Sequence, residues 1–483
     1  MSGRDAPAPM LIGGKPRPGS DAPLRPVNPA TGEPVQEVAA AGAGEIDEAV
    51  RDAARAAADA SWAGLAPQQR AAIVRGIGDR IEAQAAHFAD LQMRENGKPR
   101  GECLAQARSA AATFRYYAAV CETLSSEMPP ARGPYVPLTV HEPYGVVAAI
   151  TPWNSPLTME AQKVAPALAA GNSVVLKPSE LTPSVALALG RAAIEAGLPP
   201  GVLNVVPGRG AVAGAALVAH AGVKMISFTG GTSTGRQIAA VAADRLLPVA
   251  LELGGKSPHI VFADADLDAA AEAVCQGIFE GAGQSCVAGS RLFVERDAYR
   301  AVRDRVVARA RSLRVDLPDA EGVEMGPLVS REHRDRIERI VESARARGAR
   351  ISSGGARPQA ERLRAGAFYE PTVVEGIAND DPLAQEEVFG PVICAMPFDG
   401  EEDLLRQAND TVYGLAAGVW TGDYRRAWRI ARGLEAGTVW VNSYKHLSIA
   451  NPFGGFKQSG LGREKGVAGL RLYQQAKSIV FGL

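Results

Sequence analysis

The sequence predicts an α/β fold made of two doubly wound domains, and three observations lead to that class. Short Val- and Ile-rich runs, each closed by Gly or Pro, alternate with helical segments between residues 144 and 254, which is the order of a parallel sheet covered by helices. A second series of the same kind begins after residue 254. Two glycine-rich stretches follow predicted strands of the first series, where open α/β sheets bind their ligands.

The elements of the first series follow from the spacing of apolar residues. Helical spacing predicts helices over 45–62 and over 67–96, the second of which stops at Gly97. Helices are also predicted over 158–170 and 182–196. Between and around them, β-branched runs predict strands in VPLTVHEPYGVVAAITPW, GNSVVLKPS, GVLNVVPG and GVKMISFTG.

The second series follows LELGGKSPHIVFAD, and Gly254 and Gly255 mark the crossover between the domains. Its strands are predicted at 258–262 and 291–295, and its helices at 266–279, 297–313 and 331–347. The first domain therefore comprises 1–120 and 144–254, and the second comprises 255–467. The remaining segments, 121–143 and 468–483, are β-prone, and they form either an arm against another subunit or an ordinary edge strand.

Composition excludes several classes of partner. The 483 residues carry 52 Lys+Arg against 53 Asp+Glu, a net charge of −1, so we expect no nucleic acid or membrane partner. The N-terminal stretch lacks a signal-peptide apolar region, and no run approaches the roughly 18 apolar residues of a membrane span, which predicts a cytoplasmic protein. Five cysteines without a CxxC pair suggest neither a disulfide framework nor a metal site.

Three stretches are candidates for binding a dinucleotide. FTGGTSTGR at 228–236 follows a predicted strand and opens a helix, so its backbone N–H groups can face a pyrophosphate. GRGAVAG at 208–214 is weaker, because its glycines are one residue off the usual spacing. In VVLKPSE, Lys177 and Glu180 can hydrogen-bond a ribose diol. The alternatives are tight turns for the glycines and a solvated ion pair for Lys177 and Glu180.

Three side chains are candidates for catalysis. Cys286, in GQSCVAGSR, is a candidate nucleophile, although a single cysteine is more often an inert core residue. If it is catalytic, we expect a low thiol pKa and faster alkylation than at the other four cysteines. Glu252, in LELGGKSP, is a candidate base whose pKa burial would raise, and a salt bridge is its alternative. Asn154, in ITPWNSPL, can form an oxyanion hole with the N–H of Cys286, or a simple turn.

Seven motifs, in order along nearly the whole chain, resemble those of the NAD(P)-dependent aldehyde dehydrogenase superfamily. They are PWN at 152–154, KPSE at 177–180, FTGGTSTG at 228–235, LELGG at 251–255, GQSC at 283–286, EEVFGP at 386–391 and PFGGFKQSGLGRE at 452–464. The resemblance implies an NAD-binding domain (1–120 and 144–254), a catalytic domain (255–467) and a small β oligomerisation arm (121–143 and 468–483). It also implies a homodimer or a homotetramer.

The resemblance assigns roles by motif position. Cys286 would be the nucleophile, Asn154 the oxyanion donor and Glu252 the base, and Lys177 is counted both with this catalytic group and with the cofactor site. The cofactor residues would be Ile150, Thr151, Trp153, Lys177, Ser179, Glu180, Gly210, Phe228, Thr229, Gly230, Gly231, Ser233, Leu253, Glu387 and Phe389. The substrate channel would contain Ser155, Ser285, Val287, Tyr444 and Phe453, with YKHLSIA at 444–450 at its mouth.

The implied reaction is oxidation of a small-molecule aldehyde to the carboxylic acid. A Cys286 thiohemiacetal gives hydride to NAD, and Glu252-activated water hydrolyses the resulting thioester. Glu180 would repel a 2′-phosphate, which favours NAD, with NADP possible. Ser155, where many relatives carry an aromatic residue, predicts a channel wide enough for larger or aromatic aldehydes, and uncharged neighbours of Cys286 disfavour a semialdehyde. The alternatives are a coenzyme A-dependent acylating relative and a catalytically silent structural or binding protein of the same fold.

Overall fold

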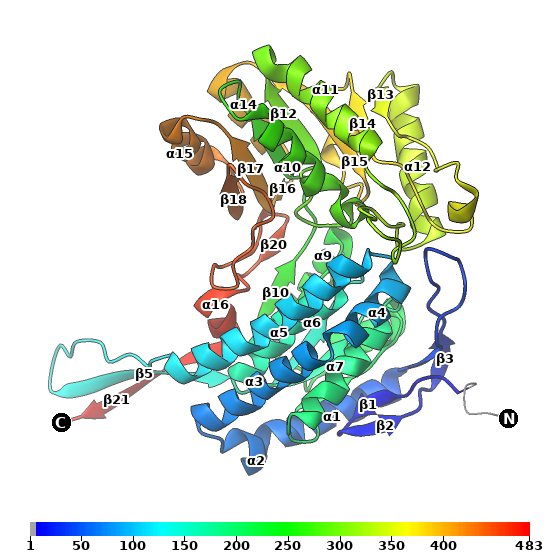
Figure 1. Ribbon diagram of the computed structural model, residues 1–483. Helices are drawn as coiled ribbons and strands as arrows, with labels where there is room; N and C mark the ends of the chain where they lie inside the picture. Colours follow the sequence, from blue (N-terminus) through cyan, green and yellow to red (C-terminus); the bar gives the residue numbers. More distant parts are fainter. Residues whose placement is uncertain (1–5) are drawn as a thin grey trace.

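The computed structural model describes residues 6–483. They form two lobes, each built on one large open sheet (Figure 1). The lower lobe in that view contains an 8-stranded sheet of order β2-β1-β8-β7-β6-β9-β10-β20. The upper lobe contains a 7-stranded sheet of order β13-β14-β15-β12-β11-β17-β18. The predicted fold class, α/β with two wound domains, is confirmed.

Five neighbouring strands of the first sheet are parallel, and their ends lie in register. They are β6 (Val146–Ile150), β7 (Ser173–Lys177), β8 (Leu203–Val205), β9 (Met225–Thr229) and β10 (Val249–Glu252). Ile150 pairs with both Lys177 and Phe228, and Thr229 pairs with Glu252. The motifs that follow these strands therefore start at one edge of the sheet, where such folds bind ligands.

Helices cover both faces of this sheet, as the alternating strand residues require. Val147 and Ala149 of β6 belong to one core, and Val146, Ala148 and Ile150 belong to the other. The first core is completed by α3 (Pro67–Ala83), α4 (Ala85–Asn96), α5 (Arg100–Thr123), α6 (Pro156–Ala169) and α7 (Pro183–Glu195). The second is completed by α1 (Ala43–Ala58), α8 (Ala215–Ala219) and α9 (Thr232–Asp244).

Two predicted helices are each divided in the structure. The 45–62 helix breaks at Asp59, whose side chain accepts a hydrogen bond from Ser61 N and starts the short α2 (Ala60–Ala63). The 67–96 helix breaks at Gln84, and α4 then ends at Gly97, whose φ of 76° favours glycine. Periodicity does not reveal such breaks, because the apolar face continues across them.

Short antiparallel strands complete the first sheet at its edges. On one side lie β1 (Met10–Ile12), which pairs with β8, and β2 (Lys15–Arg17). On the other side, β20 (Gly460–Leu461) pairs with β10, and Gly460 lies opposite Glu252. Leu253 N also donates to Ser459 O at 2.9 Å. The chain therefore returns from the second lobe to the first sheet beside Glu252.

The second lobe follows the predicted second series. Its sheet is parallel except for β13, and its strands are β11 (Pro258–Val261), β12 (Arg291–Glu295), β13 (Arg350–Ser353), β14 (Thr372–Glu375), β15 (Val392–Phe398), β17 (Ala416–Trp420) and β18 (Thr438–Val441). The helices are α10 (Leu267–Phe279), α11 (Arg296–Ser312), α12 (Arg331–Ala346), α13 (Pro382–Gln385), α14 (Gly400–Asn409) and α15 (Tyr424–Gly433). A separate apolar core lies within this lobe.

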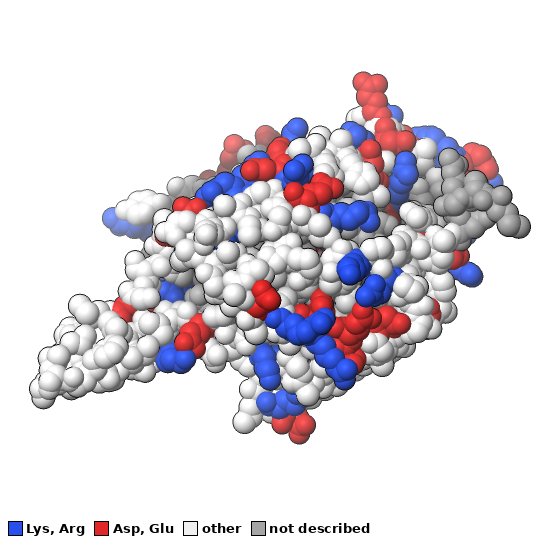
Figure 2. Space-filling view, turned by 90° about the horizontal axis from the view of Figure 1, so that it is seen from below, with Lys and Arg blue, Asp and Glu red and all other residues white. Residues whose placement is uncertain are grey.

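An arm projects from the first lobe, at the left of Figure 1. It consists of β5 (Tyr135–Pro143) and β21 (Gln474–Gly482), which pair antiparallel along their whole length. The β structure is shorter than the predicted segments, because 121–123 belong to α5 and 468–471 to α16 (Gly466–Arg471). In Figure 2 the arm is largely free of charged side chains, while positive and negative groups are mixed over the rest of that face. Its contact with another subunit stays a prediction.

Among the helices of residues 6–483, none has both the length and the apolar character needed to cross a bilayer. The cytoplasmic location stays a prediction.

The core of the first lobe contains a carboxyl group whose charge should lower stability. Glu160, on α6, is fully buried, and neither of its oxygens accepts a hydrogen bond from a described residue. Burial, with the nearby Glu95 adding to it, raises the pKa of Glu160 well above 4.5. Above pH about 4.5 the folded state therefore keeps a proton that the unfolded state loses, so this group makes stability fall as pH rises.

We expect Glu160→Gln to remove this pH dependence, because the amide cannot ionise. The Tm of the variant minus that of the unmodified protein should grow from pH 5 to pH 8 in thermal unfolding measurements. Glu33→Gln, at an exposed position, is the matched control and should show no such trend. Parallel Tm curves for Glu160→Gln and the unmodified protein would contradict the expectation.

Candidate active site

A cavity of about 590 Å³ takes residues from both lobes. The predicted site residues that line it are Trp153, Asn154, Ser155, Thr229, Gly230, Gly231, Glu252, Leu253, Ser285, Cys286, Val287, Glu387, Phe389 and Phe453. The three candidate catalytic residues, Cys286, Glu252 and Asn154, therefore share one cavity although they are far apart in the sequence.

Cys286 lies on a sharply turned loop that follows α10. Gly281, Ala282 and Gly283 all have positive φ values, of 62°, 54° and 71°. A side chain at Gly283 would overlap the carbonyl of Gly390, so glycine is required there. Gln284 is buried and fixes the loop, because its Nε2 donates to Gly281 O at 3.1 Å and its Oε1 accepts from Val329 N at 2.9 Å. The glycine-rich sequence before Cys286 thus turns the thiol toward the cavity.

Asn154 reaches this loop from the first lobe. It lies between β6 and α6, and its Nδ2 donates to Gln284 O at 2.9 Å. A side-chain amide has two N–H donors, so one remains available in the cavity that Cys286 also lines. The amide is thus fixed where an oxyanion on a carbon bonded to Cys286 could be stabilised.

Glu252 ends β10 and is a buried carboxyl group without a hydrogen-bond partner. It is 4% exposed, and neither oxygen accepts from a described residue. Desolvation by burial raises the pKa of Glu252 well above its usual range, the Glu464 carboxylate adds to this, and Lys163 opposes it. Lys163 Nζ itself pairs with Glu464 Oε1 at 2.6 Å. The direction of the shift is the expected one, and no salt bridge to Glu252 occurs within residues 6–483.

The expected low pKa of the Cys286 thiol is wrong for this structure. Burial raises the pKa of Cys286 to about 12, and the carboxylates of Glu387 and Glu252 add to the effect. The thiol is therefore protonated at neutral pH. Cys286 nevertheless differs from the other four cysteines, because it is partly exposed while they are buried. Selective alkylation is still expected, on the ground of access.

The raised pKa predicts how alkylation depends on pH. Because the thiolate is the nucleophile and the pKa of Cys286 is about 12, the iodoacetamide labelling rate should rise about tenfold per pH unit between pH 7 and 10. Mass spectrometry of the peptide that contains Cys286 measures the rate, and Cys286→Ser provides the blank. A rate that levels off near pH 8 would show that the thiol pKa is not raised.

The stretch predicted to face a pyrophosphate begins where β9 ends. Gly230 and Gly231 connect β9 to α9, and α9 is long enough for its first-turn N–H groups to attract an anion. A Cβ added at Gly231 or at Gly210 would meet open space. The Thr229 hydroxyl is buried and has no hydrogen-bond partner among residues 6–483. Gly210 lies in a short π-helical turn, Gly210–Gly214, that leads into α8.

Lys177 and Glu180 lie at the same sheet edge but outside the cavity that contains Cys286. Lys177 is buried, its Nζ donates to Pro178 O at 2.7 Å, and it lies 3.9 Å from Glu180 Oε2. Burial lowers the pKa of Lys177 to about 8. Several other predicted cofactor residues lie outside this cavity as well, namely Ile150, Thr151, Ser179, Gly210, Phe228 and Ser233. A catalytic role for Lys177 stays a prediction.

The EEVFGP motif of the second lobe supplies the cavity wall opposite the edge of the first sheet. Glu387 Oε1 accepts from Gly255 N at 3.0 Å, which links this wall to the end of the LELGG motif. The ring of Phe389 packs edge-on against Trp153, with centroids 5.3 Å apart. His333 of α12 contacts both rings, yet no motif in the sequence pointed to it.

The cavity is also lined by many residues that the sequence analysis did not predict. They come from α5 and the turn before it, from α6, from the Cys286 loop and from the residue before α16, and they are Lys98, Glu102, Gln106, Ser109, Thr113, Thr158, Met159, Gln162, Glu280 and Lys465. Lysines therefore do reach the cavity from other elements: Lys98 pairs with Glu102, and Lys445 lies 3.4 Å from Glu280. Only the regular helical spacing along α5 could have indicated this wall.

The 444–450 stretch lies at the cavity as expected, through Lys445, Leu447 and Ile449. Tyr444 lies behind the wall. It is buried, its hydroxyl donates to Val287 O at 2.9 Å, and its ring stacks on His259 at 4.4 Å. Tyr444 therefore supports the residue that follows Cys286.

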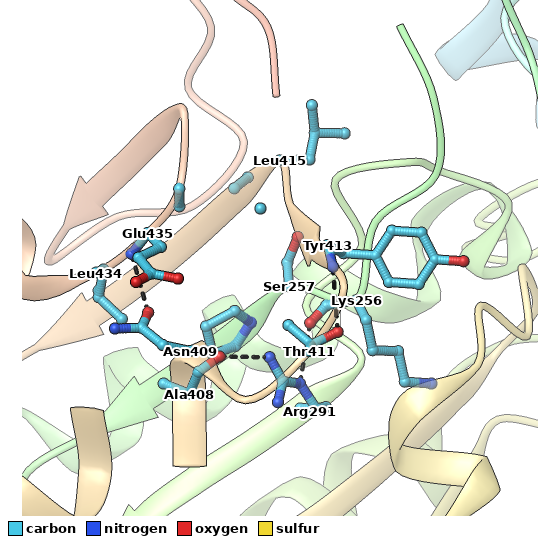
Figure 3. A pocket seen from close by; sticks show the side chains of 14 residues that line it. Lys256, Ser257, Arg291, Ala408, Asn409, Thr411, Tyr413, Leu415, Leu434 and Glu435 are labelled. Atoms are coloured by element: carbon cyan, nitrogen blue, oxygen red, sulfur yellow. Dashed lines mark hydrogen bonds between the residues drawn. The ribbon is translucent and has the colours of Figure 1, made fainter. Parts of the chain in front are cut away.

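A second cavity, drawn in Figure 3, is too small for a substrate. Its volume of about 10 Å³ is roughly that needed for one water molecule. The buried Arg291 beside it donates to Lys256 O at 2.9 Å and to Ala408 O at 2.7 Å. These bonds of Arg291 anchor the chain that follows Glu252.

The fold and the site describe a two-domain α/β protein with a thiol, an amide and a buried carboxyl group around one interdomain cavity. The sequence model of the Aldehyde dehydrogenase family matches residues 17–479. The chain is 42% identical over 456 residues to retinal dehydrogenase 2 of Homo sapiens, covering 94% of this chain and 87% of that protein. It is 40% identical over 458 residues to betaine aldehyde dehydrogenase of Bacillus subtilis, covering 94% of this chain and 93% of that protein.

Solved structures of aldehyde dehydrogenases also resemble this chain. The NAD+ complex of aldehyde dehydrogenase from Bacillus cereus matches with a TM-score of 0.97 at 39% identity, covering 99% of this chain and 97% of that one. A betaine aldehyde dehydrogenase point mutant from Staphylococcus aureus, in complex with NAD+ and with a BME-modified cysteine, matches with a TM-score of 0.96 at 36% identity, covering 98% and 96%. The chain belongs to the aldehyde dehydrogenase family.

Proposed function

We propose that this protein oxidises an aldehyde to the carboxylic acid with NAD as the oxidant, through covalent catalysis by Cys286. The observation that carries the proposal is the hydrogen bond from Asn154 to the carbonyl of Gln284, which fixes an amide donor on the loop that carries Cys286. Glu252 lines the same cavity. Family membership and the NAD+ complexes of similar proteins support the choice of reaction and cofactor.

In the proposed mechanism, Cys286 loses its thiol proton to solvent as Sγ bonds to the aldehyde carbon, and Asn154 donates to the oxygen that becomes negative. Bound NAD would supply the acceptor for the hydride that leaves this carbon. Glu252 then takes a proton from a water molecule, which attacks the carbonyl carbon of the Cys286 thioester. The C–S bond breaks, the acid leaves, and Cys286 regains its proton. The raised pKa of Glu252 makes it a stronger base once it is ionised.

The residues around the first sheet's edge fit the cofactor. Gly230, Gly231 and the first turn of α9 would bind the pyrophosphate, and the open space beside Gly231 supports that position. Lys177 and Glu180 would bind the adenosine ribose, and the charge of Glu180 favours NAD over NADP. Glu387 and Phe389 would contact the nicotinamide end, since both line the cavity that contains Cys286.

A panel of aliphatic, aromatic and carboxylated aldehydes, assayed by absorbance of the reduced cofactor, tests the function. NAD and NADP are run in parallel, and the free acid is identified as product. We expect faster reduction of NAD and no stimulation by coenzyme A, because Glu252 supports hydrolysis. No aldehyde-dependent reduction of either cofactor, with NAD binding intact by calorimetry, would favour a silent protein of the same fold. Product formation that requires coenzyme A would favour an acylating enzyme.

We also propose that the β5–β21 arm contacts another copy of the chain, giving a homodimer or a homotetramer. The arm projects from the first lobe, and its side chains Val480 and Phe481 are 58% and 55% exposed. Exposed apolar groups on a paired strand are typical of a covered interface. Sedimentation velocity of the purified protein tests this, and a monomer at micromolar concentration would contradict it.

A further inference from the structure

Phe389 is held in a backbone conformation that it would not adopt unaided. Its φ is +59°, a left-handed value that is unfavourable for a residue with a Cβ and that persists only when the surroundings impose it. Phe389 lines the cavity beside Glu387, in the motif that forms the wall opposite the sheet edge. The backbone of residues 387–389 therefore needs contacts that fix it.

Two side chains of α12 supply those contacts through three successive carbonyl groups. His333 Nε2 lies 2.8 Å from Phe389 O. Arg336 Nη1 donates to Val388 O at 3.0 Å, and its Nη2 donates to Glu387 O at 3.3 Å. The two residues are three apart on one helix, so they face the same side and reach consecutive peptide groups.

His333 must be the donor in its bond, because a carbonyl oxygen only accepts. The proton is therefore on Nε2. Burial lowers the pKa of His333, so the ring is neutral at pH 7. Protonation at lower pH would add a hydrogen on Nδ1 and leave the bond to Phe389 in place. The contact is a fixed support and not a pH switch.

The segment is confined on its other sides too. A side chain at Gly390 would overlap Ile337 of α12, and the carbonyl of Gly390 lies against Gly283 of the Cys286 loop. Glu387 Oε1 accepts from Gly255 N, near the end of the Glu252 strand. Residues 387–389 thus lie between α12 and the two segments that carry the nucleophile and the base.

We propose that His333 and Arg336 are positioning residues for the nicotinamide half of the cofactor. They act through the backbone of residues 387–389, whose side chains Glu387 and Phe389 would meet the nicotinamide ribose and ring. This inference rests on the proposed function. Loss of the donors lets the segment leave its left-handed conformation, which weakens NAD binding without changing the site for the aldehyde.

The test removes the hydrogen-bond donor of His333 and keeps an aromatic ring at that position. His333→Phe preserves an aromatic side chain beside Trp153 and Phe389 but cannot donate to Phe389 O. His333→Gln keeps an N–H donor and should restore most of the loss. Arg336→Met removes the other two bonds. Arg339→Met, an exposed arginine of the same helix for which no hydrogen bond or ion pair with a described residue occurs, is the matched control.

We expect His333→Phe and Arg336→Met each to raise the KM for NAD and the calorimetric Kd of NAD about tenfold. The KM for the aldehyde should stay within about twofold. His333→Gln and Arg339→Met should stay near the unmodified protein. Equal changes in both KM values, or a His333→Gln variant as impaired as His333→Phe, would overturn the inference. So would unchanged NAD affinity in His333→Phe and Arg336→Met.

The two proposals fail differently. If the unmodified protein reduces no cofactor with any aldehyde, the proposed function fails, while the Kd of NAD still reports on His333. If the unmodified protein turns over normally and the NAD parameters of the variants do not change, the positioning role alone fails. Should His333→Phe not fold, Arg336→Met at the exposed end of the same contact gives the result.

Discussion

Replacing Cys286 by alanine is expected to abolish aldehyde oxidation while NAD binding persists. The sulfur is the only side-chain atom in the proposed mechanism that bonds to the substrate, so its loss should lower kcat by at least about 10⁴-fold. The backbone of the loop is fixed by Gln284 and Gly283 and not by the thiol, so the fold and the cofactor edge should be unaffected. Reduced-cofactor absorbance measures turnover, and calorimetry measures NAD binding.

Cys394→Ala is the matched control for that substitution. Cys394 is fully buried in β15 and does not line the cavity, so its replacement should leave turnover intact apart from any effect on stability. Retained aldehyde oxidation in Cys286→Ala would exclude the covalent mechanism.

Glu252→Gln is expected to stop the reaction after oxidation. The amide cannot take a proton from water, so the acyl group should stay on Cys286. Rapid mixing should give a burst of NADH that approaches one per active site, followed by a steady rate about 10²- to 10³-fold lower. Mass spectrometry should find the acyl group on the peptide that contains Cys286.

The control for Glu252→Gln is Glu280→Gln, at another carboxyl group that lines the cavity. Glu280 is half-exposed and close to Lys445, so its removal should change aldehyde affinity without producing a burst. Full steady turnover of Glu252→Gln would remove Glu252 from the role of base.

Local sequence patterns were sufficient to predict most of the framework. Val- and Ile-rich runs closed by Gly or Pro predicted β6, β7 and β9, because a fully buried parallel strand needs continuous apolar residues. The sheet edge could be predicted as well, since Lys177 and Thr229 end their strands directly before turn residues. Motif resemblance named Cys286, Glu252 and Asn154, which line one cavity, but it also named Lys177 and Glu180, which lie outside that cavity.

Features that depend on distant packing were not predictable in this way. The three carbonyl bonds of His333 and Arg336 leave no trace in the sequence, because any residue type supplies a carbonyl. The thiol pKa was predicted wrongly for a similar reason. The immediate neighbours of Cys286 are small and uncharged, but Glu252 and Glu387 approach it from other segments.

The pairing of β20 with β10 has a consequence for how the chain must be made. Until residues 460–461 have left the ribosome, the strand that ends in Glu252 has an open hydrogen-bonding edge. Nearly all of the second lobe is synthesised in that interval, and an unpaired edge during synthesis invites association between nascent chains. The Glu252 carboxyl group therefore receives its final environment only as translation nears its end, which ties maturation of this part of the cavity to completion of the polypeptide.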